Sequence, residues 1–148
     1  MPTSFDEVID IALIAVDDYK LSKLYELNKD NFRTFCDGLL VRATPEFTRA
    51  AKPITINLPN RQFNRTLTFL EISILADYWV IQWWTRELQN SRQFQLKLKT
   101  SSSFNQNSEA SNLKEKGAHL DVLIENVEQK ITEYQLTQIS NAPYGEDT

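Results

Sequence analysis

The chain has 148 residues, of which 41% are hydrophobic and 24% are charged. This length and composition are typical of one globular domain with a hydrophobic core, and they exclude a disordered chain. The formal net charge of −4 argues against a dedicated nucleic-acid-binding domain, and the single cysteine, Cys36, excludes an internal disulfide.

Two further observations concern the location of the protein. No apolar run in the sequence approaches the roughly 20 residues that cross a membrane. The first basic residue is Lys20, and only acids precede it among the charged residues, which is unlike a secretory signal peptide. We therefore expect a protein that has no membrane partner and that is made in the cytoplasm.

Helical periodicity dominates the first third of the chain. Residues 4 to 7 have the spacing of a capping box, and the apolar residues that follow predict a first helix over residues 5 to 17. After a short connector, Asn28 or Asp30 is positioned to cap a second helix. Pro45 is expected to stop this helix or to start another short one, because proline lacks the N–H group that a helix interior needs.

The next segment has the alternation of a strand. Pro53 and Pro59 bracket residues 54 to 58, in which apolar and polar side chains alternate. Residues 62 to 67 are a possible partner strand. The sequence therefore predicts a small β-hairpin, or an ordered loop, inserted over residues 53 to 67.

A second capping box, at residues 68 to 71, precedes the most apolar part of the chain. A third helix is predicted over residues 69 to 89. It is apolar around almost its whole circumference, which indicates a central helix buried on several sides. Its tryptophans are expected in the core, with Trp84 the one best placed to touch a partner because it lies off the main apolar face.

The period then changes from that of a helix to that of a strand. Phe94, Leu96 and Leu98 alternate with polar residues, which predicts a strand with one apolar face. With the polar residues around it, this strand is expected to form an extended arm over residues 91 to 106. The arm either pairs with a neighbouring subunit or pairs with the hairpin of its own subunit.

A long helix is predicted from Ser108 to about residue 137, roughly 45 Å in length. Its apolar residues step alternately by four and three, as in a heptad seam. The seam comprises Leu113, Gly117, Leu120, Ile124, Val127, Ile131 and Tyr134. We expect it to pack on the third helix or on its copy in another subunit.

Together these elements predict a mainly α fold. We expect a single four-helix bundle-like domain over residues 1 to 139, with a small β-hairpin and an extended strand or arm. Residues 140 to 148, which include a proline and a glycine, are predicted to form a disordered tail.

The residue types needed for common chemistries are missing from the sequence. One histidine, His119, and one cysteine cannot supply the four ligands of a zinc site. Three scattered glycines cannot form a phosphate-binding loop, and no serine nucleophile elbow is present. We therefore predict that the protein is not an enzyme and that it uses no cofactor and no metal.

The charges are unevenly distributed along the chain, which suggests an interface. Residues 1 to 19 hold five acids and no base, whereas residues 42 to 65 hold five bases and one acid. Such segments either join identical subunits through complementary charge or are simply two different solvated faces. The candidate interface residues are Arg49, Lys52, Arg61, Arg65, Trp84, Phe94, Leu96 and Leu98.

Part of the sequence resembles a known class of proteins. Residues 68 to 83 (TFLEISILADYWVIQW), the alternating segment after them and residues 108 to 116 (SEASNLKEK) resemble small virion proteins of tailed bacteriophages and prophages. Residues 5 to 10 (FDEVID) fit the same pattern, so the resemblance spans about residues 3 to 135. It is closest to head–tail connector, or neck, proteins, and it carries over no functional residue.

The resemblance implies a structural role in the neck region of a virion, with assembly in the host cytoplasm. Its partners would be copies of itself in a ring, with portal and tail or neck proteins on either side. DNA would pass through the ring, which implies non-specific proximity to DNA. Two alternatives stay open: a tail-side completion or terminator subunit, and a non-viral cytoplasmic helical adaptor protein.

Overall fold

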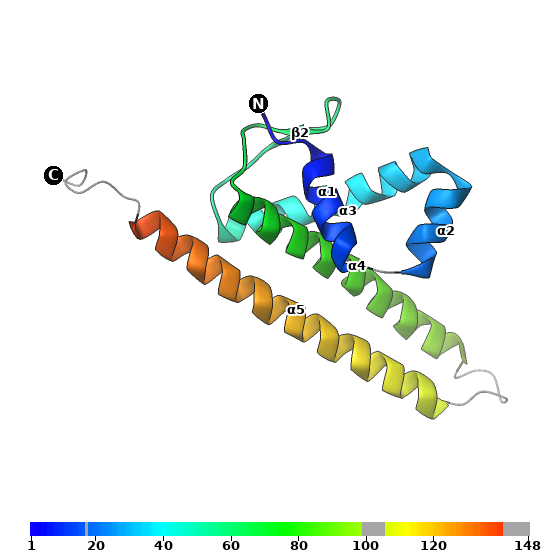
Figure 1. Ribbon diagram of the computed structural model, residues 1–148. Coiled ribbons are helices and arrows are strands. Elements are labelled where there is room, and N and C mark those ends of the chain that lie inside the picture. Colours follow the sequence, from blue (N-terminus) through cyan, green and yellow to red (C-terminus); the bar gives the residue numbers. More distant parts are fainter. Residues whose placement is uncertain (17, 99–105, 141–148) are drawn as a thin grey trace.

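The computed structural model describes residues 1–16, 18–98 and 106–140 (Figure 1). The described part contains five helices and one antiparallel pair of short strands. In chain order the elements are α1 (Phe5–Ala15), α2 (Tyr19–Leu27), α3 (Lys29–Ala50), β1 (Ile56–Asn57), β2 (Gln62–Phe63), α4 (Phe69–Leu98) and α5 (Gln106–Ser140). The prediction of a mainly α fold with a small β-hairpin is confirmed.

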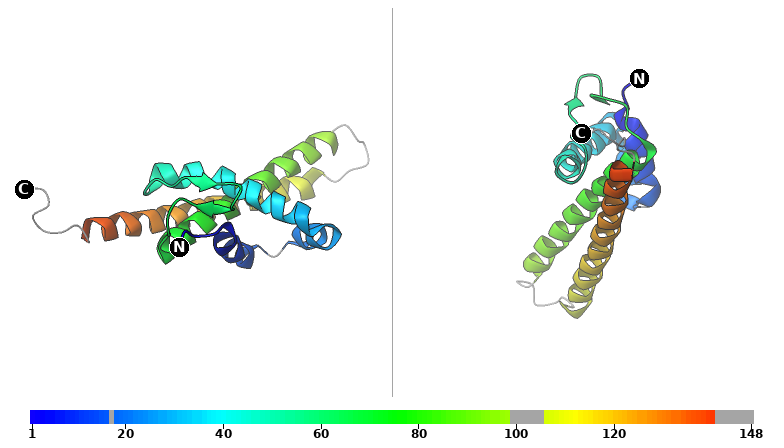
Figure 2. Two further views of the ribbon diagram at one scale, coloured as in Figure 1. Left: turned by 90° about the horizontal axis from the view of Figure 1, so that it is seen from above. Right: turned by 90° about the vertical axis from the view of Figure 1, so that its left-hand side faces the viewer.

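Two long helices form the body of the molecule. α4 and α5 run antiparallel as a helical hairpin, which we call the α4–α5 hairpin (Figure 1). α4 also packs against α3 and α1, so it is the central helix, as predicted. The smaller helices cover the N-terminal part of α4, while the far end of the α4–α5 hairpin projects beyond them (Figure 2).

The starts of α1 and α4 are fixed by the two predicted capping boxes. The Ser4 side chain accepts a hydrogen bond from the backbone of Glu7, whose carboxylate accepts from the backbone of Ser4. Thr68 and Glu71 exchange the same pair of bonds at α4, at 3.2 and 2.9 Å. Each box satisfies two N–H groups that a helix start leaves without an intrahelical partner.

The predicted connector after the first helix is itself a helix. α2 begins after Asp18, whose side chain accepts from the backbone N–H of Lys20 at 2.7 Å. Asn28 ends α2 and at the same time caps α3, because its side chain accepts from the next helix at the N–H groups of Asp30 and Asn31. One residue therefore separates two helices, and the described part of the domain has one helix more than predicted.

The prediction that Pro45 ends or restarts a helix is wrong. α3 continues through Pro45 to Ala50. The side chains of Ala43, Thr44 and Phe47 are buried on the face toward the core, and burial of this face holds the helix together across the proline. Pro45 itself is exposed.

The hairpin exists but is shorter than the predicted segments. Ile56 pairs with Phe63 and Asn57 with Gln62. The start of the chain lies beside β2, since the N–H of Phe63 donates to the carbonyl of Thr3 at 2.9 Å. The hairpin is thus anchored to the N-terminus, and the rings of Phe63 and Phe5 meet in the core, 5.3 Å apart.

The predicted arm is wrong for the residues that the structure describes. Residues 91 to 98 belong to α4 and are helical, so there is no strand at Phe94, Leu96 and Leu98. The segment is rich in glutamine, lysine and leucine, which favour a helix, and it has no β-branched residue. Residues 99–105 of the predicted arm and residues 141–148 of the predicted tail lie outside the described residues.

The predicted final helix is confirmed, and its seam is correct in the C-terminal half. Val127, Ile131 and Tyr134 are buried against the rest of the domain. Ile124 is 37% exposed, and the neighbouring Leu123 packs on the core in its place. The core surrounds α4, where Trp79 and Leu75 are fully buried. No helix in the described part of the chain combines the length and apolarity that crossing a membrane requires.

Candidate functional site

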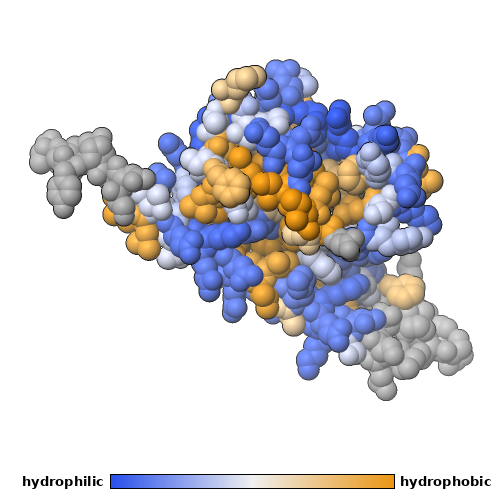
Figure 3. All heavy atoms as spheres, in the orientation of Figure 1, coloured by the Kyte–Doolittle hydropathy of each residue, from blue (hydrophilic) through white to orange (hydrophobic). Residues whose placement is uncertain are grey.

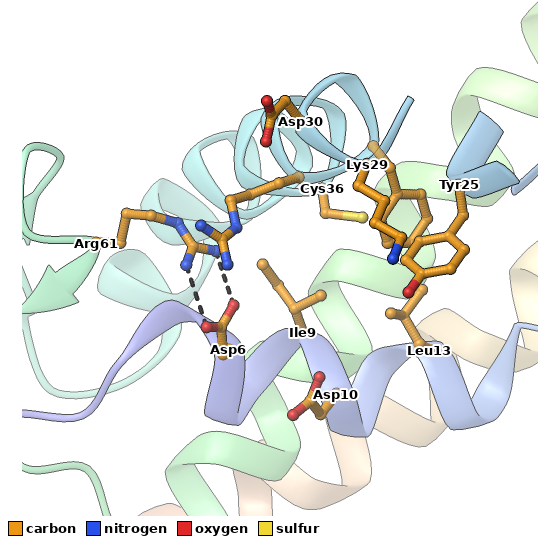
Figure 4. Close-up of a pocket in the computed structure, with 11 residues that line it drawn as sticks. Asp6, Ile9, Asp10, Leu13, Tyr25, Lys29, Asp30, Cys36 and Arg61 are labelled. Carbon is orange, nitrogen blue, oxygen red and sulfur yellow. Dashed lines mark hydrogen bonds and ion pairs between the residues drawn. The ribbon is translucent and has the colours of Figure 1, made fainter. Parts of the chain in front are cut away.

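A charged pocket of about 500 Å³ lies between α1 and α3 (Figure 4). The charged residues that line it are Asp6, Asp10, Lys29, Asp30, Arg33 and Arg61. Ile9, Leu13 and Cys36 supply the apolar part of its wall. This is the place in the described structure where acidic and basic side chains from three parts of the chain come closest to forming a site.

Arg61 is the centre of this charge cluster. Its guanidinium donates to both carboxylate oxygens of Asp37 on α3, each at 2.8 Å. It also donates to both oxygens of Asp6 on α1, at 3.1 and 2.8 Å (Figure 4). These hydrogen bonds raise the pKa of Arg61, and the bond from Arg61 lowers the pKa of Asp6.

Arg61, Asp6 and Asp37, which we call the Arg61 cluster, connect different elements of the fold. Arg61 is the last residue of the hairpin turn and has a positive φ of 52°, a conformation that is unusual for a residue other than glycine. From there it joins α1 to α3 through two carboxylates. The charge of Arg61 is matched inside the chain by Asp6 and Asp37, so Arg61 itself is not an open cation for a ligand.

Cys36 contributes a thiol to the pocket wall. Its side chain is 1% exposed. Burial raises the pKa of the Cys36 thiol to about 12, and the neighbouring carboxylate of Asp37 acts in the same direction. The thiol is therefore neutral at physiological pH, and Cys36 behaves as a small buried apolar residue.

The state of Cys36 gives a direct prediction. A disulfide reagent such as Ellman's reagent should react with native protein at pH 8 far more slowly than with protein unfolded in guanidinium, because both the burial and the raised pKa suppress the thiolate. Absorbance of the released thiolate measures the two rates. Equal rates in the native and unfolded protein would contradict the described position of Cys36.

The described residues contain no group of three or more histidine, cysteine, aspartate or glutamate side chains placed to hold a metal ion. His119 is exposed on α5 and meets the ring of Trp84 edge-on, with ring centroids 4.7 Å apart. Trp84 is half-buried by this contact, so this predicted interface residue lies largely in the seam between α4 and α5.

The four basic residues predicted at an interface fall into two classes. Arg65 donates to both carboxylate oxygens of the buried Glu71, at 3.0 and 2.7 Å, and Arg61 is matched by Asp6 and Asp37 as described above. Both charges are paired within the subunit, and their position at a subunit interface stays a prediction. The acidic start of the chain and the basic middle segment meet within one fold, so part of their charge is neutralised there.

Arg49 and Lys52 belong to the second class, because they remain on the surface. The side chain of Arg49 is 69% exposed and pairs only with Glu46, one turn away on the same helix. Lys52 is exposed and has no ion-pair partner among the residues that the structure describes. Of the apolar candidates, Phe94 and Leu96 are 51% and 62% exposed, and Leu98 is the last residue of α4.

Arg49 and Lys52 border a second pocket, of about 490 Å³, between the C-terminal ends of α3 and α5. We call it the α3–α5 groove. Its apolar residues are Ala50 and Ala51, which are the last residue of α3 and the residue that follows it, and Tyr134 and Ile139 on α5. Ile139, which is 72% exposed, is not among the predicted interface residues, because it lies beyond the end of the predicted helix.

The sequence carried a partial signal for this groove. Ile139 directly precedes the predicted tail, so a longer predicted helix would have included it, although the seam spacing itself continues at Gln138 and not at Ile139. The meeting of α3 and α5 could not be predicted from spacing, because the two segments are far apart in the chain.

The chain was compared with protein-family models, with curated proteins and with solved structures, and none of them matches it.

Proposed function

We propose that the protein is a structural subunit that assembles with copies of itself. The observation that carries this proposal is the position of exposed large apolar side chains at both ends of the α4–α5 hairpin. Phe94 and Leu96 lie near one end, and Leu136 and Ile139, which are 58% and 72% exposed, lie near the other. Exposed apolar side chains that gather in patches mark surfaces for other proteins.

Two different patches on one subunit favour a particular kind of assembly. Contacts between unlike patches of identical subunits are heterologous, and they close into a ring or continue as a filament. The resemblance of the sequence to head–tail connectors of tailed virions supports a ring. We therefore propose a connector subunit of the virion neck, located between portal and tail, through which DNA passes without sequence-specific contact.

The strength of such contacts determines where assembly occurs. An exposed ion pair contributes only about 0–1 kcal/mol, so an isolated subunit is expected to be mainly monomeric. A ring already present on the particle, such as a portal, raises the local concentration of subunits and makes weak repeated contacts sufficient. We expect a monomer in dilute solution and a closed ring in the particle.

The experiment is to follow self-association of the purified chain over a wide concentration range. Sedimentation velocity should show a monomer at low concentration, and chemical cross-linking at high concentration should give a ladder that extends beyond the dimer. A chain that stays monomeric at every concentration favours a helical adaptor for another protein. A ladder that stops at the dimer would contradict the heterologous assembly, since a two-fold contact does not propagate.

A further inference from the structure

The α3–α5 groove combines positive charge with apolar surface. Lys52 and Arg49 stand at its edge, and Ile139 is exposed beside them. Its lining includes Tyr134, which is 3% exposed and whose hydroxyl donates a hydrogen bond of 3.0 Å to Glu71. A partner for this groove needs an acidic group next to an apolar side chain.

The outer face of α1 has that combination. Asp10 is exposed and forms no ion pair with any described residue. Ile14 follows four positions later, so the two side chains are neighbours on the helix surface, and Ile14 is 85% exposed. Figure 3 shows apolar surface over α1 and the first part of α4, where Phe69 is a further exposed apolar side chain, 77% accessible.

We infer that the outer face of α1 in one copy occupies the α3–α5 groove of the next copy. In this contact Asp10 faces Lys52 and Arg49, and Ile14 packs on Ile139. The inference rests on the proposed self-assembly and assigns a partner surface, the outer face of α1, to the apolar patch around Ile139. It uses Asp10 and Lys52, which form no ion pair with a described residue, and Arg49, which pairs with Glu46 on its own helix.

The positions of the two surfaces mean that the contact forms between two copies of the chain and not within one copy. α1 and the C-terminal end of α3 lie on different sides of the molecule (Figure 2). A subunit therefore cannot fill its groove with its own α1. Each copy offers one surface of each kind, so the contact is heterologous and leaves both ends of a growing chain open until a ring closes.

A charge-swap experiment tests the contact. Lys52→Glu and Asp10→Lys each place like charges opposite one another, and each should raise the apparent dissociation constant of self-association roughly two- to fivefold, the range that exposed ion pairs allow. The double variant carries a reversed ion pair in every contact. Its apparent dissociation constant should therefore return close to that of the parent chain. Sedimentation velocity measures the constants.

A matched control separates this contact from a general effect of charge. Lys23 is exposed on α2, a helix that belongs to neither surface of the contact, and Lys23→Glu makes the same change of charge there. It should leave the association unchanged. Circular dichroism and urea unfolding should be the same for all four variants, because the three side chains that change are on the surface.

The outcomes distinguish this inference from the proposed function. Recovery in the double variant supports the contact. Association that is insensitive to both single variants, or a double variant as weak as the two losses combined, overturns the contact and leaves self-assembly standing. A parent chain that never associates, at any concentration, overturns the proposed function and this inference with it.

Discussion

Trp79→Ala should lower the free energy of unfolding by roughly 3–5 kcal/mol, a large part of the stability of a small domain. Trp79 is fully buried in the first half of α4, the helix against which α1, α3 and α5 all pack. The alanine variant loses the buried ring and leaves a cavity that rigid helices fill only in part. It also removes the indole N–H that donates to the carbonyl of Cys36 at 3.0 Å.

Two comparison variants separate the contributions to this loss. Trp79→Phe keeps most of the apolar volume but removes the hydrogen bond to Cys36, so it should cost less than the alanine variant. Trp84→Ala removes a half-buried ring that contacts His119 and should cost least of the three. Urea unfolding monitored by circular dichroism gives the three values. A Trp79→Ala variant with the unfolding midpoint of the parent would show that α4 is not the core.

The elements that could be predicted from sequence are those whose formation depends on residues close together in the chain. The capping boxes at Ser4 and Thr68 determine where α1 and α4 begin, because the bonds that form them join residues three positions apart. The length and the apolar spacing of α5 make it a helix in any context. These predictions needed no knowledge of the rest of the fold.

The elements that were missed depend on longer-range packing or on ambiguous patterns. α2 buries only Leu21, so its apolar pattern is too weak to identify a helix, and its caps at Asp18 and Asn28 are the signal that was available. The alternation around Phe94 spans too few residues to separate a strand from the end of a long helix. There the helix propensity of the intervening residues outweighs the alternation.

The candidate surfaces could be predicted only in part for a similar reason. The excess of basic residues in the middle of the chain was visible, but which of them are matched depends on tertiary contacts. Asp6 and Arg61 are 55 positions apart, and Asp37 and Arg61 are 24 apart. Only the fold shows that Arg49 and Lys52 stay exposed while Arg61 and Arg65 do not.

The second large effect on stability concerns Glu71, whose carboxylate is bound by Arg65, Thr68 and Tyr134. The side chain of Glu71 is 3% exposed. Burial acts to raise its pKa, but hydrogen bonds from Arg65, from the backbone of Thr68 and from the hydroxyl of Tyr134 outweigh burial and lower the pKa from 4.5 to about 2. The ionised form of Glu71 is therefore favoured in the folded chain.

This shift makes stability depend on pH in a defined window. Because the pKa is lower in the folded state, the stabilisation is fully present above about pH 4.5 and is lost as the pH falls toward 2. The loss amounts to roughly 3 kcal/mol from this group. Asp6, whose pKa is also lowered, adds to the same trend. Urea unfolding between pH 7 and pH 3 should show the decline, and Glu71→Gln should make it shallower.

Arg65→Leu tests whether the guanidinium is the cause. At pH 7 this variant leaves the carboxylate of Glu71 buried without its cation, which should cost roughly 3–5 kcal/mol. The penalty should shrink as the pH falls, because a protonated Glu71 no longer needs the cation. In the Glu71→Gln background the same substitution should cost less at pH 7 and show little dependence on pH. If the penalty of Arg65→Leu is the same at pH 7 and pH 3, Arg65 acts through packing alone, and the bond between Arg65 and Glu71 does not explain the acid sensitivity of the fold.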